Sequence, residues 1–160
     1  MSLTADSPIR RRVRQDRGVR IYVPATLDLA LAWRAAGAVP ADSAAYAVTD
    51  AVIDAVEGDE EEQEFAASTI AADESLVLLA DSQAVRRRVV LAADADVTVG
   101  DGAEVALAAD VPWKDVAAVL IDDASAIATV TAAIADAAPE ALDELALLWF
   151  SADELDELVK

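Results

Sequence analysis

The sequence predicts one α/β domain, built on a mixed, mostly antiparallel β-sheet of about five or six strands packed with helices. Short apolar runs of strand type alternate with helix-period segments early in the chain, and further strand-type runs follow one another in its middle. The 160 residues are enough to bury one core, and no repeat or linker divides them. The expected element order is β-α-β-α-α-β-β-β-β-α-α, and a last short helix follows at the C-terminus.

Residues 1–18 are expected to form a disordered, arginine-rich tail in front of a single domain at 19–160. The segment is polar, has no strand or helix period and ends in Gly18. Val19 begins the first core element, and GTG serves as a start codon in bacteria. The tail is therefore interpreted either as a wrongly assigned start or added sequence, or as a cationic arm for nucleic acid or an acidic partner.

The first half of the domain is expected to alternate between strands and helices whose ends carry capping signals. Thr26 is suited to N-cap a helix that Gly37 ends. Asp59 and Glu62 form a capping-box-like pair at the start of the longest helix. The expected elements are strands at 19–23 and 45–48 and helices at 26–36, 50–58 and 59–80. The buried stripe of the longest helix is expected to contain Phe65, Thr69, Ala72, Leu76 and Leu79.

The second half is expected to begin with strands and to end with helices. The strands are expected at 89–92, 97–99, 104–108 and 116–121, with a hairpin turn at 100–102. A helix starts at Asp123 or Ser125 and ends at Pro139.

Two further helices are expected at the C-terminus. The first carries Leu142, Leu145 and Trp149 on one face. The second starts with a capping box of Ser151 and Glu154, and its hydrophobic staple consists of Phe150 and Leu155.

The composition excludes several classes of chemistry. The chain has no His and no Cys, so it cannot form a Ser-His-Asp triad, a thiol nucleophile, a zinc finger, a haem–histidine bond or a disulfide framework. The positions of its five glycines match no phosphate-binding loop motif. No uncharged apolar stretch of about 18 residues and no signal peptide is present, so we expect a cytoplasmic location and no membrane partner.

The charge is strongly negative and unevenly placed. The chain has 31 Asp+Glu against 12 Lys+Arg, a net charge of −19. The arginines concentrate in the first 20 residues, so the rest of the chain should repel nucleic acid and attract basic partners. Nucleic-acid binding is expected only through the arm at 1–18. A solvated surface encoded by a high-GC or salt-adapted genome is the ordinary explanation of such acidity.

Aspartates that follow strands are the candidate metal ligands. Asp94, Asp110 and Asp122 each follow a predicted strand. Carboxylate oxygens are the ligands that Mg²⁺ takes in proteins, often together with a substrate phosphate. Aspartate is also an ordinary residue at strand exits and helix caps, so a structural role remains the alternative.

Four other features are candidates for binding. Leu147, Leu148, Trp149 and Phe150 cannot all face one helix stripe, and Trp is enriched in binding hot spots. Trp113 is a candidate exposed aromatic, and Glu60 and Glu61 belong to an acidic segment at 57–64 that is either a docking surface or a solvated first helical turn. Arg86, Arg87 and Arg88 are expected to form ion pairs or, alternatively, to bind an anion.

These features favour a non-enzymatic domain that contacts another, unidentified protein through Trp149 and the acidic segment. One alternative is a Mg²⁺- or Mn²⁺-dependent enzyme acting on a phosphorylated substrate through the strand-end aspartates. A second alternative is an acidic mimic of nucleic acid that occupies the groove of a basic protein. Apart from that divalent cation, no cofactor is expected.

The sequence also resembles a small actinobacterial family of uncharacterised function. The resemblance extends from about residue 19 to the C-terminus and leaves out the arginine-rich tail. It is carried by Ile21-Tyr22-Val23-Pro24-Ala25-Thr26, the acidic run 58–62, Arg87-Arg88-Val89-Val90 before Asp94, Asp122-Asp123-Ala124 and Leu148-Trp149-Phe150. Phe150 stands where the family pattern has Tyr, and Asp153-Glu154-Leu155 stands where it has Gln-Glu-Leu. The resemblance implies no activity, cofactor or partner.

Overall fold

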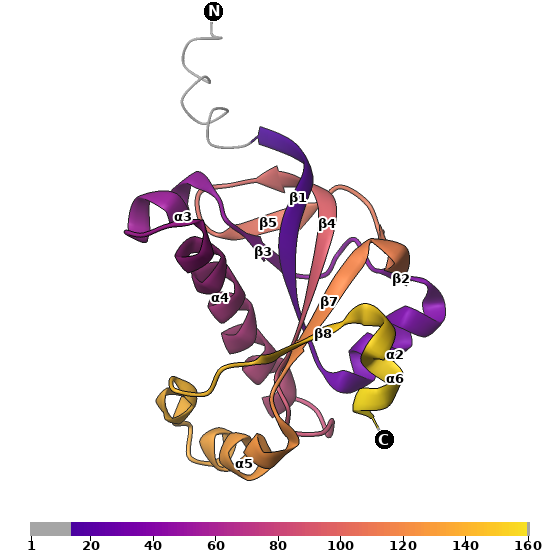
Figure 1. The fold of residues 1–160 in the computed structure, drawn as a ribbon, viewed down its shortest axis with the longest axis vertical. Helices are drawn as coiled ribbons and strands as arrows, with labels where there is room; N and C mark the ends of the chain where they lie inside the picture. Colours follow the sequence, from indigo (N-terminus) through magenta and orange to yellow (C-terminus); the bar gives the residue numbers. More distant parts are fainter. Residues whose placement is uncertain (1–13, 160) are drawn as a thin grey trace, which may run out of the picture.

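A six-stranded antiparallel sheet forms the centre of the computed structural model, which describes residues 14–159 (Figure 1). The strand order is β1-β3-β5-β4-β7-β8, and β1 also pairs with β4. The strands are β1 (Arg14–Ala25), β3 (Ala45–Ala47), β4 (Val89–Val99), β5 (Glu104–Leu107), β7 (Val116–Ile121) and β8 (Leu148–Ser151). A separate two-stranded sheet joins β2 (Ala38–Val39) to β6 (Val111–Pro112).

Five α-helices accompany the sheets within the described range. They are α2 (Leu27–Ala36), α3 (Asp50–Ala55), α4 (Glu60–Ala80), α5 (Ile127–Ala135) and α6 (Leu155–Leu158). Short 3₁₀ turns lie at η1 (Trp113–Asp115), η2 (Ala124–Ala126), η3 (Pro139–Leu142) and η4 (Ala152–Glu154). The predicted α/β class with a mostly antiparallel sheet is therefore confirmed.

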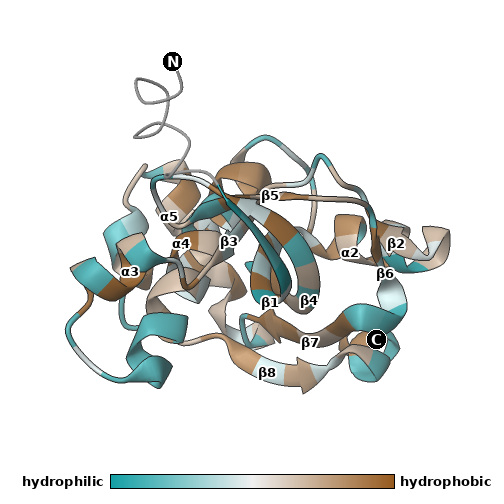
Figure 2. Cartoon of the chain, turned by 90° about the horizontal axis from the view of Figure 1, so that it is seen from above, coloured by the Kyte–Doolittle hydropathy of each residue, from teal (hydrophilic) through white to brown (hydrophobic). Residues whose placement is uncertain are grey.

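The long strand β4 organises the sheet. One of its edges pairs with β1 over nearly its whole length, while the other pairs first with β7 and then with β5. Because β3 joins β1 to β5, these three strands and β4 close into a ring. β7 and β8 extend the sheet from the first half of β4, and β8 forms its outer margin (Figure 2).

The two sides of the strands face two different cores. Ile21, Leu91 and Val119 pack with α2 and α6 residues in the larger core. Their neighbours point the other way: Tyr22 and Leu120 pack with small residues of α4 in a second core. This alternation follows from the two-residue period of a strand, and it places α4 across one face of the sheet.

The capping signals predicted for α2 and α4 are confirmed. The Thr26 hydroxyl accepts a hydrogen bond from the Leu29 N–H at the start of α2, and Gly37 ends that helix with a φ of 90° in the left-handed region. The Asp59 carboxylate accepts from the Glu62 N–H at the start of α4. These ends could be predicted because each depends only on residues within one helical turn.

The first strand begins earlier than predicted. β1 starts at Arg14 rather than at Val19, and Arg14 and Asp16 pair with the end of β4. The register shifts between Asp16 and Val19, where Gly18 has a φ of 60°. Residues 14–18 are thus part of the sheet, and the rest of the predicted tail, 1–13, lies outside the described residues.

The buried face of α4 also differs from the predicted stripe. Ala72 and Leu79 are buried as expected, but Phe65 is 67% exposed and Thr69 is exposed. The residues of α4 that are buried are Ala67, Ala71, Ala72, Ser75 and Leu79. Small side chains let the helix lie close to the sheet, so the buried face follows the alanines and the serine rather than the largest apolar residues.

The helix predicted over Leu142, Leu145 and Trp149 is wrong. A 3₁₀ turn ends at Leu142, a further turn follows at 143–144, and Trp149 lies in β8, which pairs with β7. A strand sends neighbouring side chains to opposite faces, and this arrangement accommodates the consecutive apolar residues 147–150. Ser151 does precede the final turn, but its hydroxyl makes no capping hydrogen bond there.

Candidate functional site

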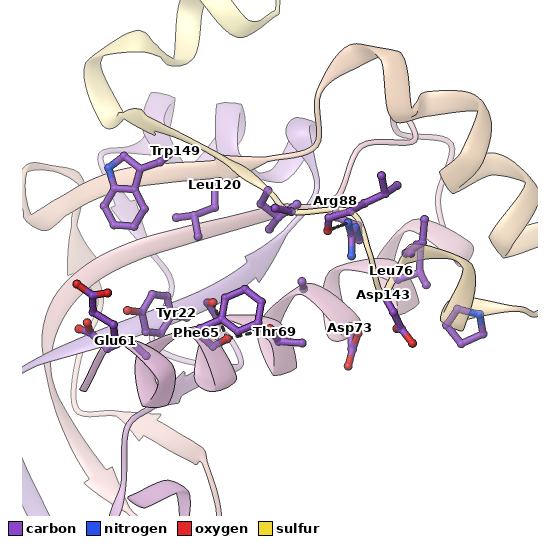
Figure 3. A pocket seen from close by; sticks show the side chains of 18 of the residues that line it. Tyr22, Glu61, Phe65, Thr69, Asp73, Leu76, Arg88, Leu120, Asp143 and Trp149 are labelled. Atoms are coloured by element: carbon purple, nitrogen blue, oxygen red, sulfur yellow. Dashed lines mark hydrogen bonds between the residues drawn. The ribbon is translucent and has the colours of Figure 1, made fainter. Parts of the chain in front are cut away.

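A groove of about 560 Å³ lies between α4 and the segment that leads from η3 into β8 (Figure 3). Side chains from β1 and β7 form its floor, and the apolar lining includes Tyr22, Phe65, Leu120 and Trp149. Its acidic lining residues are Glu61, Glu64, Asp73 and Asp143, and its basic ones are Arg20 and Arg88.

The α4 wall of the groove presents acidic and aromatic side chains. The Asp59 cap fixes where the helix begins, and Glu61, Glu64 and Phe65 follow within its first two turns. Positions three and four apart share a helix face, so Glu61 is a neighbour of both Glu64 and Phe65. The large exposed fraction of Phe65, 67%, is therefore open surface beside carboxylates.

The floor of the groove is buried, and this burial keeps the phenol of Tyr22 neutral. Tyr22 of β1 is buried, and Leu120 of β7 belongs to the same core. Burial and, secondly, the negative charge of Glu64 raise the pKa of Tyr22 to about 12. Tyr22 therefore remains a hydrogen-bond donor throughout the physiological pH range.

The opposite wall is built around Trp149. Its partner across the strand pair is Leu120, and residues paired in this way share one face of the sheet. Trp149 therefore projects from β8 toward the end of the groove that holds Glu61 and Tyr22, and 58% of it is exposed (Figure 3). Phe150 pairs with Val119 and packs partly buried against the core on the other face.

The groove has an excess of negative charge. The two guanidinium groups that line it are already engaged, because Arg20 pairs with Asp94 at 2.9 Å and Arg88 with Asp122 at 2.8 Å. Neither carboxylate partner lines the groove. The four carboxylates that line the groove outnumber its two guanidinium groups, each of which is hydrogen-bonded to a carboxylate outside the groove, so the site favours a cation.

Asp73 belongs to this acidic wall, and its carboxylate is partly desolvated although the residue is exposed. Burial raises the pKa of Asp73. The positive charge of Arg88 lowers that pKa, and the negative charge of Asp143 raises it.

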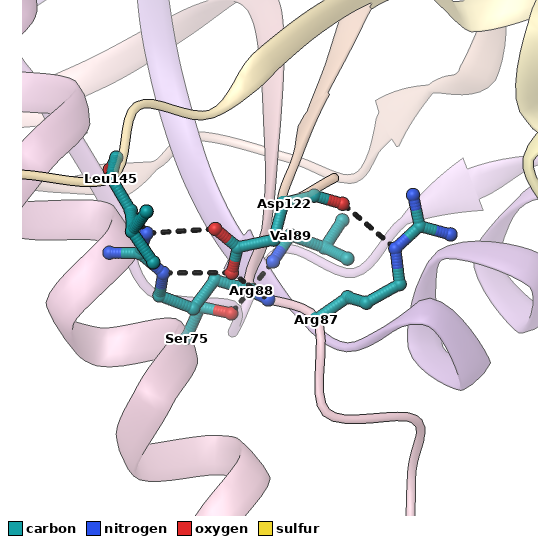
Figure 4. A network of polar contacts seen from close by, with 6 residues as sticks. All are labelled: Ser75, Arg87, Arg88, Val89, Asp122 and Leu145. Atoms are coloured by element: carbon teal, nitrogen blue, oxygen red, sulfur yellow. Dashed lines mark hydrogen bonds and ion pairs between the residues drawn. The ribbon is translucent and has the colours of Figure 1, made fainter. Parts of the chain in front are cut away.

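A buried polar network holds the wall in place (Figure 4). The Asp122 carboxylate accepts hydrogen bonds from the Arg88 backbone N–H at 2.8 Å, from Nε at 2.9 Å and from Nη2 at 2.8 Å. The Nη2 group also donates to the Leu145 carbonyl at 3.2 Å, next to β8. Ser75 donates to the Ala25 carbonyl and accepts from the Val89 N–H, which attaches α4 to two strands.

The three candidate metal ligands are not brought together. Asp94 pairs with Arg20 in the middle of the sheet, whereas Asp122 binds Arg88 at the start of β4. The six positions from 88 to 94 along an extended strand correspond to about 20 Å. Asp110 instead accepts from the Ala41 N–H beside the small sheet. Within residues 14–159, no group of three or more candidate ligand side chains is placed to hold a metal ion.

The candidate arginines differ in what they contact. Arg88 forms the predicted kind of ion pair, but the pair is buried. Arg87 donates to the carbonyls of Asp122 and Leu158, and Arg86 donates to those of Leu79, Ser82 and Ala84.

Of the candidate partner contacts, the groove unites Glu61 and Trp149. Glu60 is exposed but does not line the groove. Trp113 lies in η1, partly buried against the larger core, and its backbone N–H donates to the Gly37 carbonyl. Sequence reasoning missed Tyr22, Phe65, Asp73 and Asp143. Only Phe65 had a local signal, since it follows the acidic run directly.

A family model covers residues 19–159, which is nearly the whole described range. The chain belongs to the family of unknown function DUF6912. The resemblance to an uncharacterised family is thereby confirmed. Comparison with curated proteins and with solved structures gave no match. In the part of this DUF6912 chain that the structure describes, no helix has the length and apolar character needed to span a membrane.

Proposed function

We propose that this DUF6912 domain is a non-enzymatic binding module whose groove receives a basic segment of a partner protein. The observation that carries the proposal is that Glu61 and Trp149, 88 positions apart in the sequence, line one groove. The acidic segment and the exposed tryptophan form one surface instead of two.

The chemistry of the lining indicates what the groove would bind. Four carboxylates surround it, and its two guanidinium groups are held by their own carboxylates. Trp149 and Phe65 offer aromatic faces beside these carboxylates. Arg and Lys side chains combine a cation with an apolar stem, so they suit both parts of such a lining.

Direct binding of a defined peptide tests the proposal. The probe is a fluorescein-labelled octapeptide in which Arg and Leu alternate, and its control alternates Glu and Leu. We expect fluorescence anisotropy to give a Kd below about 1 mM for the basic peptide and no binding of the acidic one. No binding of the basic peptide, or equal binding of both, would contradict the proposal.

Matched variants locate the binding surface. Trp149→Ala is expected to weaken binding by about tenfold or more, as for a buried aromatic anchor. Val77→Ala removes an exposed apolar side chain of α4 outside the groove and should leave the Kd unchanged. Glu61→Gln should weaken binding more than Glu60→Gln, which makes the same charge change one residue away.

The same variants separate this proposal from a nucleic-acid mimic. A mimic acts through carboxylates distributed over its surface, so Glu60→Gln and Glu61→Gln would weaken binding equally and Trp149→Ala would have no effect. That result would mean that the whole acidic surface, and not the groove, determines binding.

A further inference from the structure

β8 contributes Trp149 to the wall of the groove, and the outer edge of this strand is open. Among residues 14–159, β8 pairs only with β7, so the other side of its backbone has no strand partner. Figure 2 shows β8 at the margin of the sheet with no other element beyond it. An edge of this kind presents N–H and C=O groups that can pair with an added strand.

β8 is short, but it has no charged residue, no proline and no bulge to discourage pairing at its edge. Natural edge strands carry Lys, Pro or a bulge that discourages pairing. The four residues of β8 are Leu148, Trp149, Phe150 and Ser151, and their register with β7 has no shift. Leu148 is 41% and Trp149 58% exposed, so the edge is also apolar.

We infer that the partner segment binds by strand addition, as an extended chain paired with the free edge of β8. This inference rests on the proposed function and specifies how the groove is occupied. In an added strand, every second side chain would lie on the Trp149 face of the sheet. Those side chains would enter the groove and approach Glu61 and Asp143.

Charge selects a basic partner segment over a second copy of this chain. Two β8 edges pairing with each other would bring two acidic grooves together, in a chain that carries a net charge of −19. A segment with Arg or Lys at alternate positions meets the carboxylates instead. The occupant is therefore an extended partner segment with a two-residue period of cationic side chains.

Amide hydrogen exchange of the full chain, measured by NMR with and without the Arg/Leu octapeptide, tests this binding mode. In an antiparallel pair, N–H groups of one strand point alternately toward and away from the partner. The β8 amides that bond to β7 should be protected in both samples. The outward amides of β8 should gain about tenfold or more in protection only when the peptide is bound.

Backbone methylation of the probe provides the second arm. Two further octapeptides carry N-methyl groups on the arginines or on the leucines. Strand addition predicts that one of them binds about tenfold or more weaker than the unmethylated peptide, whereas the other keeps its Kd, because only one set of N–H groups faces β8.

The outcomes separate the two proposals. Alternating protection together with a one-sided effect of methylation supports strand addition. Tight binding without protection of β8, or an equal effect of both methylations, overturns strand addition while the groove remains the binding site. Absence of binding overturns the proposed function as well. Concentration-dependent protection of β8 without peptide would assign the edge to a second copy of the chain and overturn the inference.

Discussion

Arg88 and Asp122 form the most completely buried ion pair in the described part of the chain. Their side chains are 7% and 1% exposed, and three hydrogen bonds join the two residues. Two charges removed from water in this way are stabilised only while both are present. The pair also reaches the Leu145 carbonyl, so its integrity affects the wall of the groove.

Loss of one partner should be far more costly than loss of both. We expect Asp122→Ala to lower the free energy of unfolding by about 3–5 kcal/mol, because it leaves the Arg88 guanidinium buried and unpaired. The double variant Arg88→Met, Asp122→Leu should recover most of that loss. Urea unfolding followed by circular dichroism measures both.

The control is Asp94→Ala, which breaks the exposed pair with Arg20 and should lower the free energy of unfolding by less than about 1 kcal/mol. Equal losses for Asp122→Ala and Asp94→Ala would contradict this account.

Asp73 should make the stability of the fold depend measurably on pH. Its pKa is raised mainly by burial, so the folded chain holds a proton over a pH range in which the unfolded chain has lost it. This contribution to stability is fully present below the unfolded-state pKa of about 3.9 and is lost as the pH rises through the folded-state value. Ionised Asp73 therefore makes the neutral-pH fold less stable.

Asp73→Asn removes this ionisation while it keeps the shape of the side chain. We expect the variant to be more stable than the unsubstituted chain at pH 7 and to lose that advantage as the pH falls toward about 4. Urea unfolding at a series of pH values measures the difference. Glu60→Gln removes one negative charge from an exposed site and corrects for the change in net charge. A stability difference that does not change with pH would mean that burial of Asp73 is not the cause.

At the scale of elements, α4 determines both the core and the groove. Its inner face uses Ala67 and Ala71, which are fully buried against the sheet, while its outer margin carries Phe65. Close contact through small residues fixes how far Glu61 stands from Trp149. The position of this helix therefore links core packing to the width of the binding site.

Enlargement of the inner face tests that link. Ala71→Leu adds a bulky side chain where none fits, and we expect it to lower the free energy of unfolding by about 1–3 kcal/mol. Ala80→Leu makes the same change at the exposed end of α4 and should alter stability by less than about 0.5 kcal/mol. Chemical denaturation of both variants gives the comparison. If Ala71→Leu is no less stable than Ala80→Leu, α4 does not pack as closely as described.

The elements also explain which parts of the fold the sequence could predict. The ends of α2 and α4 depend on Thr26, Gly37 and Asp59, whose effects act within one turn. β8 was predicted as a helix because its strand character depends on β7, which lies far away in the sequence. An apolar run of this length fits either state until its neighbours are known.

The candidate site was predictable only in parts. Glu61 and Trp149 were each recognisable from local patterns, one in an acidic helix start and the other in an apolar cluster. Their convergence depends on the return of the chain to the outer edge of β7, which no local pattern encodes. Asp73 and Asp143 had no distinguishing signal among the many aspartates of the chain.

At the scale of the whole molecule, charge acts in opposite directions on stability and on binding. A net charge of −19 makes the folded chain repel itself, and the same charge attracts a basic partner. Salt screens both interactions, because the Debye length falls to about 10 Å at 0.1 M and about 3 Å at 1 M. One added solute should therefore stabilise the fold and weaken the complex.

This opposition can be measured in one titration with NaCl at pH 7. We expect the Tm to rise by about 3 °C or more between low salt and about 0.5 M NaCl, because weaker self-repulsion favours the compact state. Over the same range, the Kd for the Arg/Leu octapeptide should increase. At about pH 4.5, close to the pI of ≈ 4.1, most of the net charge is gone and NaCl should change the Tm much less. An equal rise in Tm at both pH values would assign the effect of salt to general solvation, and the acidity of the chain would then have no part in its stability.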